Sequence, residues 1–268
     1  MSCRNRSPFG VLPRGWPGLL VLSLAAASCT TPSVRPRVLY ALFEVDGDLQ
    51  TRSGSTDAAV TSDELGLDDA EGVLNPSIDF DWGSLHLSAE GFQAEFDGEG
   101  MAGGTLTFGG SQIEVGEMVA SDVEFGVYQA RAVWDIVPDP LMDLGIGIGV
   151  GLIDYDLQLD SLTGTNQIQG DDRLPFGFVT VRAAKSLGDL EVLVHASGLG
   201  FELDDQSIQF IDLQGLLIWR FWDLGTGHAE LQAGYRYFDV EYELDGAGTD
   251  LEADGTLSGP VVGLSVRF

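Results

Sequence analysis

Three side chains that can carry out acid–base or nucleophilic chemistry lie close together in the stretch "EVLVHAS", Glu191 to Ser197. His195 can act as a general base, Ser197 as a nucleophile and Glu191 as the group that orients the imidazole. Their spacing is even, so in a β-strand all three lie on one face. Side chains on a single strand rarely converge on one substrate. We therefore interpret the set as a hydrogen-bonded part of the protein interior and expect no enzymatic activity.

Charge and cysteine content narrow the remaining chemistry. Acidic residues outnumber basic ones 42 to 13, which gives a net charge of −29 and argues against nucleic acid as a partner. The only cysteines are Cys3 and Cys29, so the mature chain has no internal disulfide and no thiolate metal site. We predict no cofactor and name no metal ligand, although the acid-rich loops are able to attract divalent cations.

The N-terminus carries an export signal. Three arginines precede the apolar run "LLVLSLAAASC" at Leu19–Cys29, which is shorter than the about 20 residues of a membrane-spanning helix. This order is typical of a secretory signal peptide, which we place at residues 1–28. Its end, "AASC", resembles the lipobox of bacterial lipoproteins, so we favour acylation of Cys29; ordinary cleavage after Ala27 is the alternative. We assign residues 29–37 to a periplasmic linker.

From residue 38 to the end, apolar and polar side chains alternate with the period of β-strands, and no convincing amphipathic helix occurs. The predicted strands are Val38–Leu49, Asn75–Trp82, Leu85–Asp97, Val119–Ile136, Met142–Leu159, Arg173–Leu187, Leu190–Leu203, Ser207–Phe221, His228–Leu244 and Leu251–Phe268. An all-β chain with an even strand count is typical of a transmembrane antiparallel up-and-down β-barrel. We predict about ten strands, with eight or twelve as alternatives.

The lengths of the connections support a barrel that spans a membrane. Short connections follow every second strand: Gly83–Ser84, Val137–Leu141, Gly188–Asp189 and Trp222–Gly227. The longest of the others are Gln50–Leu74, Gly98–Met118 and Asp160–Asp172. Outer-membrane barrels have long extracellular loops and short periplasmic turns. We therefore expect both chain termini on the periplasmic side.

The two faces of the strands differ in character. In "MDLGIGIGVGL", Met142–Leu152, the even positions are apolar and the odd ones are Asp143 and glycines, which predicts a lipid-facing wall and a lumen with room for long side chains. Charged residues fall on the lumen side in this register, where unpaired charge is costly. The predicted lumen network is Arg131, Asp135, Asp143, Arg182, Glu191, His195, Asp212, Arg220, Glu230, Arg236 and Arg267.

Aromatic residues mark the two membrane interfaces. Near the tight-turn ends of the predicted strands lie Trp82, Trp134, Trp219, Phe221 and Phe268, and Tyr237 lies near the loop end. After Tyr237 the apolar face continues as Asp239 and Glu241, which indicates that this strand leaves the lipid and extends into water.

The end of the chain, "GYRYFDVEYEL" followed by "LSGPVVGLSVRF", resembles the last two strands of small bacterial outer-membrane β-barrels. The resemblance implies a Gram-negative cell envelope and a terminal Phe268 that is recognised by the barrel-assembly machinery. With ten predicted strands the chain also resembles the omptin proteases, and it is similar to small-barrel enzymes that act on lipids. In those enzymes the histidines lie near the loop-side rim or on the outer wall. His86 and His228 begin predicted strands at the opposite, periplasmic end. We therefore do not expect this chain to share the catalytic activity of those enzymes.

We therefore predict a monomeric outer-membrane barrel with a structural or surface-interaction role, in contact with outer-membrane lipid and lipopolysaccharide. A narrow ion or small-solute channel is the alternative, and an outer-membrane hydrolase is the second alternative. A wide, porin-like channel is not expected, because wide aqueous lumens occur at about 16–18 strands.

Overall fold

The computed structural model describes residues 31–53, 56–67, 70–108, 111–139, 142–164, 166–203, 206–245 and 250–268. The predicted signal peptide and Cys29 lie outside the described residues. Where the structure describes the chain, no helix is long and apolar enough to cross a membrane.

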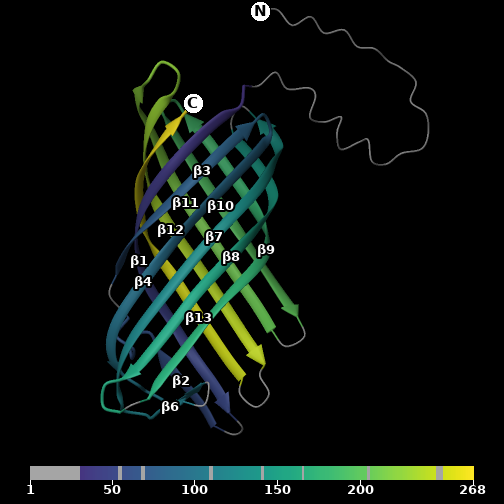
Figure 1. Ribbon diagram of the computed structural model, residues 1–268. Helices are drawn as coiled ribbons and strands as arrows, with labels where there is room; N and C mark the ends of the chain where they lie inside the picture. The colour runs from purple at the N-terminus through teal and green to yellow at the C-terminus, as the bar shows by residue number, and fades with distance from the viewer. Residues whose placement is uncertain are drawn as a thin grey trace, which may run out of the picture. The chain divides into compact units, whose positions relative to one another are not determined.

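Ten long antiparallel strands form the wall of a closed barrel (Figure 1). In hydrogen-bonded order they are β1 (Ser33–Ser53), β3 (Glu71–Trp82), β4 (Leu85–Met101), β7 (Met118–Asp139), β8 (Met142–Ser161), β9 (Gln167–Leu187), β10 (Leu190–Leu203), β11 (Gln206–Asp223), β12 (His228–Asp245) and β13 (Asp250–Arg267). The ring closes where β13 pairs with β1. The prediction of a ten-stranded, all-β barrel is confirmed, and the eight- and twelve-stranded alternatives are wrong.

Three short strands lie inside the connections that we predicted to be long loops. They are β2 (Thr56–Thr61), which pairs with the far end of β1, and β5 (Leu106–Phe108) with β6 (Ser111–Ile113), which pair with each other. The regular structure at this end of the barrel is therefore more extensive than the sequence indicated.

The seam of the barrel corrects one predicted boundary. The backbone N–H of Phe268 donates to the carbonyl of Val34 at 3.0 Å, so residues that we assigned to a linker belong to β1. β1 begins at Ser33. Within its first residues Arg35 and Arg37 are buried and Pro36 is exposed, so the side chains already alternate between the two faces as in a strand. Pro36 has no N–H to give to the ladder, and it lies within residues 29–37, which we assigned to the linker.

The outer wall is apolar over the half of the barrel next to the tight turns. On β8 this face runs from Met142 to Leu152, which matches the about 9–11 residues that a tilted strand needs to cross a bilayer. Aromatic side chains are exposed at both edges of this band: Trp82, Trp134, Trp219, Phe221 and Phe268 at the tight-turn edge, and Tyr40, Tyr128, Tyr235 and Tyr237 at the loop edge. An apolar band between two aromatic girdles is the exterior of a transmembrane barrel.

The glycines of β8 make room for aromatic rings inside the barrel. Gly149 is paired with Phe178 and Gly151 with Phe176 on the neighbouring strand β9. A side chain at either glycine would collide with the ring of its partner. The predicted role of these glycines, to leave space for long side chains from adjacent strands, is confirmed at both positions.

The two faces of the strands exchange character beyond the loop edge of the apolar band. On β8, Ile153 and Leu159 point inward and are buried, whereas Asp156 is exposed on the outside. On β7, Asp122 and Glu124 are exposed outward in the same way. The loop-side half of the barrel is thus polar outside and apolar inside, as a water-soluble barrel is. The strands continue past their predicted ends because this half no longer follows the membrane pattern.

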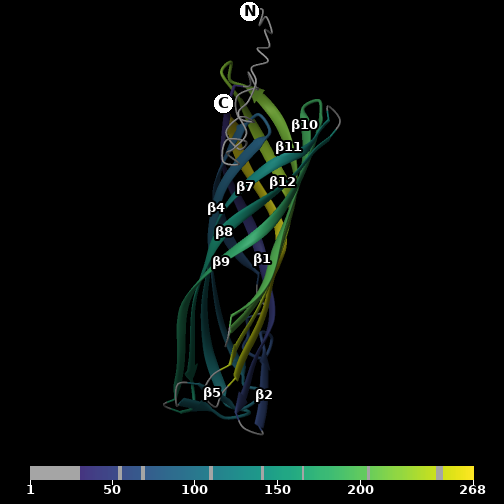
Figure 2. The same ribbon diagram turned by 90° about the vertical axis from the view of Figure 1, so that its right-hand side faces the viewer.

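The barrel wall separates into two groups of strands toward the loop end (Figure 2). The described pairs between β9 and β10 end at Val179 and Gly198, and those between β3 and β4 begin at Ser77 and Glu90. Beyond these points β4, β7, β8 and β9 form one group, which we call the first lobe, and β10 to β13 with β1, β2 and the start of β3 form the second lobe. The loop-side half therefore resembles two sheets that face each other.

Candidate functional site

Charged side chains fill the barrel interior at the level of the apolar band, and one group of them surrounds Glu90. The carboxylate of this buried residue is paired with Arg131 and, at 3.2 Å, with Arg236. Arg236 also donates through Nη2 to Asp212 at 2.8 Å. Arg37 approaches Glu90 to 3.8 Å and donates through Nε to a serine hydroxyl on β3.

A second group lies nearer the tight turns, around Glu191 and Glu230. Arg35 contacts both carboxylates at 3.2 Å, and it links β1 with β10 and β12. Arg220 and Arg267 approach Glu191 to 3.6 Å and 3.5 Å. The carboxylate of Glu230 also accepts a hydrogen bond from the hydroxyl of a serine on β13 at 2.7 Å.

His86 connects two further carboxylates at this end of the barrel. Its Nδ1 lies 2.7 Å from Asp81 and its Nε2 lies 2.9 Å from Asp135. Arg182 lies 4.0 Å from the other oxygen of Asp135, and Arg267 reaches Asp81 at 3.1 Å. We call the charged residues of these three groups the polar plug.

The structure brings most of the predicted lumen residues into this plug. Asp143 is half-buried at the tight-turn end of β8, and none of the ion pairs given above for the described residues includes it. Five participants were not predicted: Arg35, Arg37, Asp81, His86 and Glu90. Their sequence signal is the same alternation as elsewhere. The linker assignment hid Arg35 and Arg37, whereas Asp81, His86 and Glu90 lie inside predicted strands and were not included in the predicted lumen network. Such pairs are stable inside a barrel because each buried charge meets an opposite one.

Glu191, His195 and Ser197 do not act on one another as a catalytic set. His195 is buried, with its Nδ1 3.0 Å from a guanidinium nitrogen of Arg131. Ser197 donates its hydroxyl proton to Thr180 at 2.9 Å, and Glu191 is held by Arg35. Each of the three side chains thus has a different partner, and all three are enclosed in the barrel.

A layer of phenyl rings covers the polar plug on its loop side. Phe92 lies 5.4 Å from Phe43 and 6.3 Å from Phe238 between ring centroids, and Phe210 lies 4.6 Å from Phe176. The rings of Phe125 and Phe178 extend the layer. These centroid distances are those of interacting aromatic pairs, so the layer separates the charged interior from the space above it.

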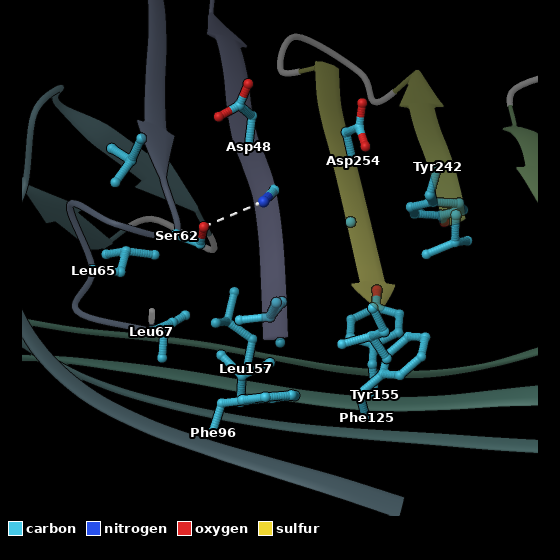
Figure 3. Close-up of a pocket in the computed structure, with 18 of the residues that line it drawn as sticks. Asp48, Ser62, Leu65, Leu67, Phe96, Phe125, Tyr155, Leu157, Tyr242 and Asp254 are labelled. Atoms are coloured by element: carbon cyan, nitrogen blue, oxygen red, sulfur yellow. Dashed lines mark hydrogen bonds between the residues drawn. The ribbon is translucent and has the colours of Figure 1, made fainter. Parts of the chain in front are cut away.

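Above the phenyl layer an apolar chamber of about 250 Å³ lies between the two lobes (Figure 3). The first lobe contributes Phe96, Val123, Phe125, Ile153, Tyr155, Leu157, Leu159, Ile168, Gly170 and Leu174. The second contributes Val45, Gly47, Asp48, Val60, Ser62, Leu65, Leu67, Val240, Tyr242, Asp254, Gly255 and Leu257. Figure 3 shows Leu157, Phe96 and Tyr155 beneath the strands of the second lobe.

The connection between β2 and β3 closes one side of the chamber. The backbone of Leu65 and Gly66 lies directly against Gly98 of β4, beyond the point where β3 and β4 part. The hydroxyl of Ser62 accepts a hydrogen bond from the N–H of Gly47 at 3.2 Å, and its own N–H donates to the carbonyl of Gly47 at 2.8 Å. The turn therefore presents leucine side chains to the chamber and bonds its polar groups to β1.

This chamber was not predicted from the sequence. Its signal is the exchange of faces, as in "IDYDL" at Ile153–Leu157, where the apolar residues move from even to odd positions. On β12 the corresponding change is the appearance of Asp239 and Glu241 after Tyr237 on the face that had been apolar. We interpreted it only as a strand that leaves the lipid and extends into water. Where the outward positions of a strand become acidic and its inward positions become apolar, the pattern predicts an apolar barrel interior at that level.

Comparisons with known proteins give similarity in fold alone. No protein-family model and no curated protein matches the sequence. The outer-membrane protease OmpT of Escherichia coli is 9% identical, with a TM-score of 0.49, over 87% of this chain and 97% of that one. Ail, the attachment invasion locus protein of Yersinia pestis, is 10% identical, with a TM-score of 0.29, over 89% and 100%. The toluene transporter TodX of Pseudomonas putida is 9% identical, with a TM-score of 0.32, over 91% of each chain. A protease, an attachment protein and a transporter are thus among the similar barrels, and fold does not decide between roles.

Proposed function

We propose that this chain is a monomeric protein of the bacterial outer membrane that does not conduct and whose acidic loop-side half interacts with lipopolysaccharide. Export by the N-terminal signal, insertion by the barrel-assembly machinery through Phe268, and periplasmic termini belong to this proposal. Acylation of Cys29 would add a lipid anchor on the periplasmic side. The observation that carries the proposal is the change of the outer wall from apolar to acidic at the loop edge of the apolar band.

The acidic outer surface faces the level at which phosphate groups of lipopolysaccharide would lie. On adjacent strands Glu95 is paired with Glu124, and Asp97 with Asp122, so like charges face each other directly. Glu95, Asp97 and Asp122 each place an oxygen within 4.8 Å of the others. Repulsion between such carboxylates favours divalent cations, which bind oxygen ligands and can bridge carboxylate to phosphate.

Two layers inside the barrel favour a closed lumen over the narrow channel that is the alternative. An ion that crossed the barrel would have to pass between paired charges such as Arg236 and Asp212 and then between the phenyl rings above them. Opening either layer would leave buried charges without partners or break aromatic contacts.

The surface role can be tested by binding of purified lipopolysaccharide to the protein in detergent, with Mg²⁺ or with a chelator. We expect saturable binding that the chelator abolishes and that D97N/D122N weakens at least fivefold. The matched control D189N/D223N, which removes two carboxylates at the tight turns, should bind as the unaltered chain does. Binding that survives the chelator, or that both double variants weaken equally, would contradict the bridging role.

The closed lumen can be tested separately in planar bilayers. We expect no discrete conductance steps from the unaltered barrel, whose insertion is verified by its heat-modifiable mobility on gels. Reproducible single-channel steps would instead establish the narrow channel.

A further inference from the structure

We propose that the chamber between the two lobes is a binding site for a small, uncharged hydrophobic molecule that reaches it from the loop side. This inference concerns the barrel interior and does not depend on the lipopolysaccharide role of the outer surface. It rests on the apolar lining of the chamber, its size, the absence of Arg and Lys from its described lining residues, and the side from which it can be reached.

The lining selects an apolar ligand. Leu157, Val123, Val45 and Val240 are only partly buried and border the chamber from both lobes. An empty space of this kind leaves its lining atoms without contacts on one side, so a molecule that fills it gains dispersion energy. Ser62, the hydroxyl-bearing residue of the β2–β3 turn, is already hydrogen-bonded to β1 and adds no strong preference for a polar ligand.

The volume sets the size of the ligand. An engineered apolar cavity of about 150 Å³ binds benzene in another protein, and this chamber has about 250 Å³. A substituted single ring, a pair of fused rings or a branched aliphatic molecule of similar bulk fits that volume. A dye with several rings or a whole lipid does not.

The lining of the chamber disfavours anions. Asp48 and Asp254 border it on adjacent strands β1 and β13, but both are exposed and occupy outward positions of these strands (Figure 3). Arg and Lys are absent from the described lining residues. An anionic group would therefore lose its hydration in the chamber without meeting a base, whereas an uncharged molecule pays no such cost.

The ligand has to enter from the loop side because the other side is closed. The phenyl layer and the polar plug lie between the chamber and the tight turns. On the loop side, Ile168, Gly170 and Leu174 line the chamber from the part of β9 that pairs with β8 and, among the described strands, not with β10. Among the described residues, no strand pairing joins the first and second lobes along this edge, so access there breaks no strand pairing.

The test is equilibrium dialysis of radiolabelled naphthalene against the full chain in detergent, with a protein-free micelle blank. We expect uptake above the blank to saturate at about one molecule per chain. V240F fills the chamber and should weaken binding at least tenfold, whereas V262F, the same change on the exposed outer wall of the next strand, should leave it unchanged. The anion 2-naphthoate should bind at least tenfold more weakly than naphthalene.

Folding of each variant is verified by heat-modifiable mobility, and V123F replaces V240F if the latter does not fold. Uptake that does not saturate, equal binding by the filled variant, or equal binding of naphthoate would each overturn the inference. A failure here leaves the lipopolysaccharide result unaffected, because the two experiments probe opposite faces of the wall.

Discussion

The guanidinium group of Arg236 lies over the ring of Phe92, with its central carbon 5.0 Å from the ring centroid, while the same group is hydrogen-bonded to Asp212. This is the place where the polar plug meets the phenyl layer. Arg236 is 1% exposed and also contacts Glu90, so one side chain joins β12 to β11 and β4 across the interior. A cation on an aromatic face and two carboxylates together compensate its loss of hydration.

Truncation of this arginine should be costly. R236A leaves Asp212 and Glu90 buried with one partner fewer, and we expect the free energy of unfolding to fall by about 3–5 kcal/mol. Urea unfolding followed by heat-modifiable mobility measures the change. The control R173A removes an exterior pair with Asp154, whose arginine side chain is 74% exposed, and should cost at most about 1 kcal/mol. Equal losses in the two variants would refute the assigned role of the plug.

Neutralising one acid of the outer surface should stabilise the barrel. Asp97 is paired with Asp122, so D97N relieves a like-charge contact and should raise the free energy of unfolding at low salt, on the order of 0.5 kcal/mol. D154N, the matched change on β8, removes the 3.2 Å partner of Arg173 and should not stabilise. Because exterior charges are screened, the gain in D97N should shrink as salt is added. Stabilisation of the same size in both variants, at every salt concentration, would show that cross-strand repulsion is not its origin.

Close packing of β8 against β7 should make one glycine irreplaceable. A side chain at Gly147 would run into the backbone carbonyl of Ala132, whereas one at Gly215 meets nothing within 4 Å. G147A should therefore lower the free energy of unfolding by about 1–3 kcal/mol. G215A should be neutral or slightly stabilising, since alanine restricts the unfolded chain. Similar unfolding midpoints for the two variants would contradict the tight contact.

The terminal aromatic side chain should matter for assembly more than for stability. F268A keeps the backbone bonds to Val34 and removes only the exposed ring, 58% of the residue being accessible. We expect a several-fold drop in the heat-modifiable fraction recovered from cells. F221A, which removes another exposed aromatic residue of the same girdle, should assemble normally. A normal yield of F268A would count against recognition of the terminal ring.

The sequence predicted the fold well because a membrane imposes one simple pattern on every strand. β10 has the predicted bounds, Leu190–Leu203. The tight turns lie where the alternation of apolar and polar residues breaks off. The pattern failed where the membrane ends. There the inward positions of β8 become apolar, as at Ile153, and the outward positions become acidic, as at Asp156. β8, β9 and β4 continue beyond the level at which lipid selects their outer residues.

The polar plug and the chamber also differ in how far the sequence predicts them. Inward charges such as Arg131 and Glu230 are conspicuous in an alternating strand, and the sequence placed them on one face. Which carboxylate each arginine meets depends on the curvature and closure of the wall, as for Arg35 with Glu191 of a distant strand. The chamber depends on the separation of β9 from β10, which no local pattern encodes.

Spin labels on the outer wall test the central claim most directly, with the chain in lipid vesicles and its two natural cysteines replaced by serine. Labels at Ile148 and Val262, in the apolar band, should collide readily with oxygen and be protected from a water-soluble nickel chelate. Labels at Asp97 and Asp156, beyond the band, should show the opposite preference. Equal access of the nickel chelate to all four positions would contradict a barrel whose tight-turn half lies in lipid and whose loop-side half stands in water.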